Sequence, residues 1–275
     1  MELIDTHLHL IHRQFQTYDW LRNNPLLNAS DHTLAEVQAL AAGRITASLF
    51  MEVDATDYRS EARMVRGMMK PGNGLLGQIV SCRPETDDGF ADWLDECAAL
   101  NVVGFRRILH EVPDDVSQSD TFRRNLRAIG ATGRAFDMVF QARQLPVALE
   151  LARACPDVTL VLDHCGVPDI AGGAMDPWRA DMAALAALSH VNVKLSGIMA
   201  YCGGPATLDL LRPWVDHIID VFGPNRVLWG SDWPVVNLGG GLPLWLDITD
   251  GLLAGLTPAE QAAIRAGTAR RVYGV

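Results

Sequence analysis

The chain has 275 residues, of which 49% are apolar and 20% are charged, a composition that is ordinary for a globular protein with a large buried core. Its 33 acidic residues outnumber its 23 basic ones and give a net charge of −10, which disfavours nucleic-acid and membrane partners because both present negative charge. The five cysteines are scattered and form no C-x-x-C pair, which disfavours a disulfide scaffold or a structural zinc cluster. We see no leader pattern and no long apolar run, so we expect a cytoplasmic protein.

Short apolar runs typical of β-strands alternate with helical segments along the chain. We expect eight strands, near Leu3–His9, Ile45–Val53, Leu75–Cys82, Val102–Leu109, Ala135–Phe140, Val158–His164, Val191–Ser196 and Arg226–Trp233. Strands that alternate with helices pair in parallel through right-handed crossovers. Eight such units predict a single-domain (β/α)8 TIM barrel over residues 1–275, with a doubly wound open sheet as the alternative. No glycine-rich phosphate loop follows the first strand, which disfavours a dinucleotide-binding fold.

Capping residues and prolines mark the expected helix boundaries. Thr33 and Thr257 each begin a capping-box pattern, and Gly43 is placed to end the first helix. Pro146 suits the first turn of the helix that follows the fifth strand. Pro213 is expected to break or kink the helix before the eighth strand.

Two long segments without helix or strand signals, Ile11–Ser30 and Pro234–Leu242, each follow a strand. In a barrel they would lie at the C-terminal mouth, where substrate loops occur. Trp20, in the first segment, is placed to form a stacking wall for a ring-shaped ligand or to anchor the loop on the barrel rim.

Polar residues recur where apolar strands end, which is where barrel enzymes place their chemistry. His7 and His9 end the first strand and point to one face, because side chains alternate along a strand. The same alternation lets only one residue of each adjacent polar pair face the interior. Of Arg106 and Arg107 we favour Arg106, and of Asp163 and His164 we favour His164.

Lys194 and Ser196 lie on the seventh strand, and Asp232 follows the eighth. Buried charged residues are rare without a reason, so their repetition at five strand ends predicts a polar site at the barrel mouth. The remaining histidines differ in their expected roles. His190, His217 and His32 are expected to be structural, whereas His12 and His110 follow strands and are placed to reach the mouth.

The motifs "IDTHLHL", "GFRR", "LVLDHCGVPDI", "VNVKLSG" and "GSDWPV" together resemble the amidohydrolase superfamily. More narrowly, they are similar to its branch of sugar aldonolactonases, such as L-fuconolactonase and L-rhamnonolactonase, with 2-pyrone-4,6-dicarboxylate hydrolase as a relative. The resemblance covers nearly the whole chain and implies a (β/α)8 barrel that hydrolyses a cyclic ester. Arg106 stands on the strand where two-metal members carry a bridging carboxylate, and an arginine cannot ligate a metal.

We therefore expect either no required metal or one weakly bound zinc ion. The ligands of such an ion would be His7, His9, His164 and Asp232. Ester hydrolysis needs an activated water and a stabilised oxyanion, and we expect Asp232 as the general base, with the three histidines orienting the water and the carbonyl oxygen. The expected substrate-binding residues are Arg106, Lys194, Trp20 and Ser196.

The expected partner is a small-molecule lactone, and a homodimer is also compatible with the sequence. We favour a sugar lactone over a dicarboxylated pyrone, because a pyrone with two carboxylates would need more arginines at the mouth than Arg106. Arg83 and Arg179 are the candidates for such additional arginines. Three alternatives remain open: a zinc-dependent decarboxylase, a lactone isomerase of the same superfamily, and a barrel that binds a ligand without catalysis.

Overall fold

The computed structural model describes residues 1–275, and eight strands form one parallel sheet in chain order. The strands are β1 Ile4–Leu8, β2 Ala47–Met51, β3 Leu75–Ser81, β4 Val102–Ile108, β5 Ala135–Val139, β6 Leu160–Leu162, β7 Val191–Leu195 and β8 Val227–Trp229. A parallel bridge between Leu8 and Trp233 brings the chain after β8 beside β1. The sheet therefore nearly closes into a barrel, and the predicted (β/α)8 architecture is confirmed.

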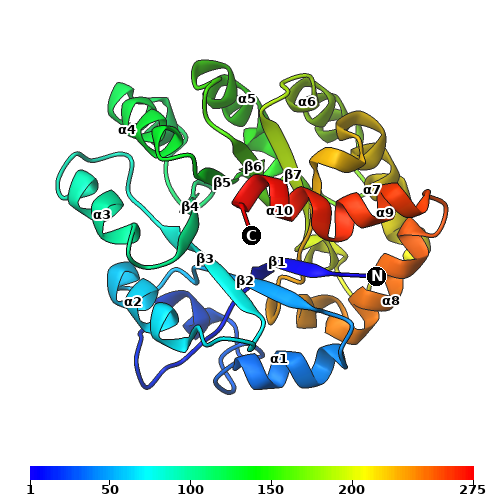
Figure 1. Ribbon diagram of the computed structural model, residues 1–275. Helices are drawn as coiled ribbons and strands as arrows, with labels where there is room; N and C mark the ends of the chain where they lie inside the picture. The colour runs from blue at the N-terminus through cyan, green and yellow to red at the C-terminus, as the bar shows by residue number, and fades with distance from the viewer.

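Helices surround the barrel (Figure 1). Those that follow successive strands are α1 Leu34–Ala41, α2 Tyr58–Met68, α3 Phe90–Cys97, α4 Asp120–Ala131, α5 Leu145–Ala154, α6 Asp176–Ala186, α7 Leu208–Phe222 and α8 Leu242–Leu253. The chain ends in α9 Pro258–Ala262, a π-helical turn Ala263–Gly267 and α10 Thr268–Tyr273. No helix combines the length with the apolar composition that a membrane span requires.

Most of the expected helix boundaries are confirmed. The Thr33 side chain accepts the Glu36 backbone N–H, and Thr257 forms a reciprocal capping box. Pro146 lies in the first turn of α5. Of the expected break or kink at Pro213, the break does not occur, because α7 runs without interruption through that residue and is 15 residues long. One proline removes a single backbone hydrogen bond, and the long apolar face of α7 still packs on the barrel.

The apolar core has two parts. A large cluster lies between the sheet and the helices, and a small cluster fills the N-terminal end of the barrel interior. The small cluster includes Ile4 and Ala47 near the strand starts and Val272 and Tyr273 from α10. Figure 1 shows α10 across the centre of the view, at this end of the barrel. With that end closed by apolar packing, any open site must lie at the other end of the strands.

Candidate active site

A cavity of about 360 Å³ opens at the C-terminal ends of the strands. The two long loops contribute to it as expected, since Trp20 belongs to the first and Val235 to the second. Trp20 is held by a hydrogen bond from its indole N–H to the Val53 carbonyl at 2.8 Å. The predicted residues His9, Arg106, His164 and Asp232 also line the cavity.

Asp232 lies on the floor of the cavity and is only 2% exposed. Its Oδ1 is 3.3 Å from His9 Nε2, and its Oδ2 is 3.9 Å from His164 Nδ1. Its backbone N–H donates to the His7 carbonyl at 2.9 Å. Asp232 and His164 both have left-handed backbones, with φ of 55° and 54°, and such strain is held where surrounding contacts fix it.

The two histidines of the first motif share the barrel interior, as predicted, but the strand that carries them is irregular. Pairing between β1 and β2 changes register between Asp5 and Leu8. Ile4 therefore belongs to the inner cluster whereas Leu8 belongs to the outer one, although simple alternation would put them on one face. The Asp5 carboxylate accepts the His7 backbone N–H at 3.0 Å, which holds the strand at this irregularity.

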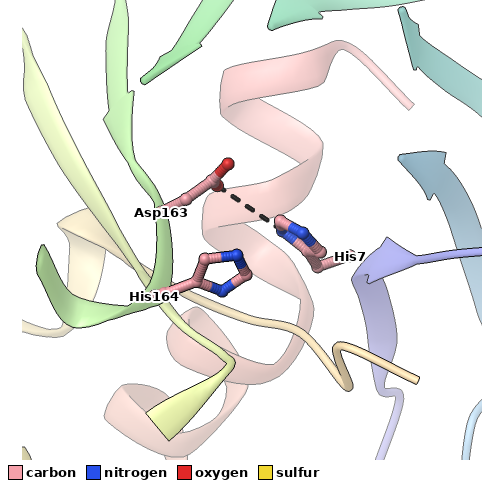
Figure 2. A group of neighbouring side chains, drawn as sticks. All are labelled: His7, Asp163 and His164. Carbon is pink, nitrogen blue, oxygen red and sulfur yellow. Dashed lines mark ion pairs between the residues drawn. The ribbon is translucent and has the colours of Figure 1, made fainter. Parts of the chain in front are cut away.

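The interpretation that only one residue of the Asp163 and His164 pair faces inward is wrong. Figure 2 shows both side chains beside His7. Asp163 is fully buried, and its Oδ1 is 3.5 Å from His7 Nδ1. The alternation fails because β6 ends at Leu162, and the chain then turns through left-handed φ angles at His164 and Cys165. Alternation applies only while the backbone stays extended.

Arg106 reaches the cavity because a buried carboxylate directs it there. Glu52, just after β2, accepts from Arg106 Nε at 2.6 Å, and the Glu52 carbonyl accepts from Nη2 at 2.7 Å. Arg107 points the other way and pairs with Glu85 at 2.7 Å, as predicted. Glu52 was not among the predicted site residues, although it follows an apolar strand in the same way as the residues that were.

Lys194 and Ser196, which were expected to contact the substrate, are not among the residues that line the cavity. Both are fully buried. Lys194 Nζ binds the Asp137 carboxylate and lies 3.3 Å from Asp163 Oδ1. The Ser196 hydroxyl is 3.1 Å from His164 Nδ1. These residues support the side chains above them.

Two buried histidines, His7 and His164, are held neutral by their surroundings. Burial lowers the pKa of His7 well below its usual range, although the nearby Asp163 carboxylate opposes the shift. Burial also lowers the pKa of His164, and Asp232 opposes that shift. Asp163 behaves differently: burial would raise its pKa, but Lys194 and His7 hold the pKa well below the usual range. The site therefore combines neutral imidazoles with an ionised buried carboxylate.

The remaining histidines lie largely as expected. His110 lines the cavity, whereas His12 is not among the lining residues. The side chains of His32, His190 and His217 each lie 3.0 Å from a backbone carbonyl, so their roles are structural. The upper cavity also contains residues that the sequence analysis did not single out: Asn23, Asp54, Glu111 and Tyr201.

The donor set formed by His9 and Asp232 on the cavity floor and by the fully buried His7 behind it fits one metal ion. The ligand atoms of His7, His9 and Asp232 lie within 4.8 Å of one another and are buried. His9 Nδ1 is 3.0 Å from the Met51 carbonyl, which can only accept, so in neutral His9 the proton is on Nδ1 and the Nε2 lone pair faces the Asp232 carboxylate. Two acceptor atoms 3.3 Å apart need a proton or a cation between them. Imidazole nitrogens with a carboxylate oxygen are a donor set that zinc accepts.

Comparisons with known proteins agree with this geometry. The family model described as amidohydrolase matches residues 4–275. An L-fucono-1,5-lactonase from Burkholderia ambifaria is 38% identical over 138 residues, which is 50% of this chain and 48% of that relative. A second L-fucono-1,5-lactonase, from Burkholderia multivorans, is 28% identical over 98% of this chain and 95% of its own length.

Solved structures show the same fold. A crystal structure of an amidohydrolase from Burkholderia multivorans with bound zinc matches with a TM-score of 0.91 and 26% identity, covering 100% of both chains. An amidohydrolase from Bifidobacterium longum subsp. infantis matches with a TM-score of 0.77 and 26% identity, covering 100% of this chain and 99% of the other. Both agree with the barrel fold described above.

Proposed function

This chain belongs to the amidohydrolase family, and we propose that it opens the cyclic ester of a sugar-acid lactone to the hydroxy acid, with Asp232 as the general base. The observation that carries the proposal is the position of Asp232 on the floor of the cavity, between His9 and His164. The names of two similar proteins, both L-fucono-1,5-lactonases, support the choice of a lactone. The proposed setting is sugar-acid catabolism in the cytoplasm.

Each step of the proposed reaction has a residue in place. Water attacks the ester carbonyl carbon and passes a proton to the Asp232 carboxylate. Arg106, a fixed cation at the cavity wall, stabilises the negative charge that develops on the carbonyl oxygen. The tetrahedral intermediate then collapses, the ring carbon–oxygen bond breaks, and the proton held by Asp232 passes to the leaving alkoxide. His9 and His164, beside Asp232, orient the water.

The charges of the cavity support a neutral, hydroxylated substrate. Arg106 is the only lysine or arginine among the lining residues, whereas Asp54, Glu111 and Asp232 are acidic. A dicarboxylated ring would meet this excess of negative charge and be repelled. Carboxylates accept hydrogen bonds from hydroxyl groups. We therefore favour a polyhydroxylated lactone over a pyrone dicarboxylate.

We propose that one zinc ion can bind but is not required. His7, His9 and Asp232 would hold it, with His164 close by, and it would supply Lewis-acid polarisation of the ester carbonyl. Arg106 Nη1 lies 3.3 Å from His7 Nε2. A guanidinium at that distance competes for the His7 lone pair and repels a second cation, so we expect weak binding.

The test is turnover of a panel of aldono-1,5- and 1,4-lactones, followed by proton release, with and without a chelator. Asp232→Asn is compared with Asp216→Asn, which changes an exposed carboxylate on α7. We expect turnover that survives chelation, falls at least about 100-fold in Asp232→Asn and is unchanged in Asp216→Asn. Product analysis by NMR separates hydrolysis from isomerisation. Failure to hydrolyse any lactone would refute the proposal and favour a decarboxylase or a binding protein.

A further inference from the structure

Asp163 lies at the centre of a buried group of charges that the proposed reaction does not use directly. It is fully buried and does not line the cavity. Three positively charged or proton-bearing groups surround its carboxylate: Lys194 Nζ at 3.3 Å, His7 Nδ1 at 3.5 Å and Arg106 Nη1 at 3.7 Å. A buried carboxylate is costly unless it is paired, so this position has a specific role.

The same contacts determine which nitrogen of His7 carries the proton. Arg106 Nη1 faces His7 Nε2 at 3.3 Å, and a guanidinium can only donate. Neutral His7 must therefore accept at Nε2 and carry its proton on Nδ1, which faces the Asp163 carboxylate. The two neighbours agree, so the tautomer is fixed from both sides of the ring. The Nε2 lone pair is thereby kept on the side of Asp232, whose Oδ1 is 3.8 Å away.

Asp163 is itself held from beneath. Lys194 Nζ bridges Asp163 and Asp137, and the Tyr273 hydroxyl donates to Asp137 at 2.8 Å. Tyr273 belongs to α10, which closes the N-terminal end of the barrel. The chain of contacts thus runs from the C-terminal helix to the imidazole behind the cavity floor.

We propose that Asp163 is a positioning residue that fixes His7 as the Nδ1–H tautomer and, through the same carboxylate, restrains Arg106 at the cavity wall. It touches no substrate and acts through these two side chains. As far as the effect on turnover is concerned, the inference rests on the proposed lactonase reaction. The tautomer is a property of the free protein and can be measured without any substrate.

The decisive measurement is a long-range proton–nitrogen NMR spectrum of protein labelled with ¹⁵N-histidine. The chain has eight histidines, and the His7 signals are those missing from the His7→Gln spectrum. We expect the wild-type spectrum to show a protonated Nδ1 and an unprotonated Nε2 at His7. A proton on Nε2 would overturn the proposal whether or not Asp163→Asn folds, and whether or not a lactone is the substrate.

Asp163→Asn then tests the consequence, with Asp216→Asn as the control. An asparagine amide can donate to Nδ1 as well as accept from it. The substitution also removes the negative charge that holds Arg106 Nη1 at 3.7 Å, which loosens the contact on the other side of the ring, so we expect the single tautomer to be lost. The expected fall in kcat is about 10- to 100-fold, as for other residues that orient a site imidazole. KM should stay within about threefold because Asp163 does not line the cavity. An unchanged tautomer in Asp163→Asn, with or without a loss of kcat, would show that Asp163 does not fix His7.

Discussion

Replacing Lys194 by methionine tests the buried charges below the active site most directly. The Lys194 ammonium contacts the carboxylates of Asp137 and Asp163, and all three side chains are fully buried. Removing it leaves two buried carboxylates without their shared cation, and breaking a buried ion pair costs about 3–5 kcal/mol. At this chain length about 1 kcal/mol lowers Tm by about 2–3 °C, so we expect a fall of roughly 6–15 °C.

The loss should depend on pH in a defined direction. Burial raises the pKa of Asp137 to about 7, even though Lys194 and Tyr273 oppose the shift. Without the ammonium that pKa rises further, so Asp137 takes up a proton at lower pH and relieves part of the penalty. The Lys194→Met variant should therefore lose more stability at pH 8 than at pH 6, when each is compared with wild type by thermal denaturation.

A double variant supplies the control. Asp137→Asn combined with Lys194→Met removes one negative and one positive charge together, and the Tyr273 hydroxyl keeps an acceptor in the asparagine oxygen. We expect it to recover most of the stability that Lys194→Met loses, because replacing both partners of a buried pair is far cheaper than removing one. A single variant that melts within about 2 °C of wild type at pH 8 would refute this reasoning. So would a double variant as unstable as the single one.

Three further predictions concern other contacts. Arg106→Lys loses the paired contacts to Glu52 and should lower kcat/KM about 100-fold or more in lactone hydrolysis; a fall below about threefold would contradict the assigned role. Trp20→Ala should raise KM about three- to tenfold with little change in kcat if Trp20, which lines the cavity, is the proposed stacking wall; an unchanged KM would leave Trp20 as a loop anchor only. Burial and the nearby Glu52 raise the pKa of Glu61 well above its usual range, so the folded chain keeps a proton that the unfolded chain has lost. Between the pKa of Glu61 in the unfolded chain and its raised pKa in the folded chain, the free energy of unfolding then falls by about 1.4 kcal/mol per pH unit. Urea denaturation between pH 5 and pH 8 should show a weaker pH dependence of stability in Glu61→Gln than in wild type. An equal pH dependence in both would exclude Glu61 as the cause.

The barrel could be predicted from the sequence because its signals are repeated. Eight apolar runs separated by helical segments are compatible with few topologies. An error in predicting where a strand ends does not change the number of strands. The sixth and eighth strands illustrate such errors: the runs near Val158–His164 and Arg226–Trp233 form strands only at Leu160–Leu162 and Val227–Trp229. The residues beyond these short strands form irregular turns, and these turns carry the site.

The site itself was harder to predict, because side-chain alternation stops where a strand stops. The rule correctly separates Arg106 from Arg107, which lie inside β4. It fails at Asp163 and His164, which lie beyond the end of β6. The positive φ angles of His164 and Cys165 end the extended backbone there, and both side chains lie beside His7. A histidine with a left-handed backbone conformation is uncommon, and no pattern in this sequence predicts one at His164.

The contrast between Arg106 and Lys194 shows what decides the depth of a long charged side chain. Each residue lies inside a strand and points into the barrel, and both are expected from the sequence to bind substrate. Arg106 extends to the cavity because Glu52, which follows β2, binds its guanidinium at the mouth. Lys194 stays in the layer below because its ammonium binds Asp137 in the middle of β5 and lies 5.4 Å from the ring centre of Tyr273. The partner carboxylate, and not the position on the strand, therefore determines which cation reaches the cavity.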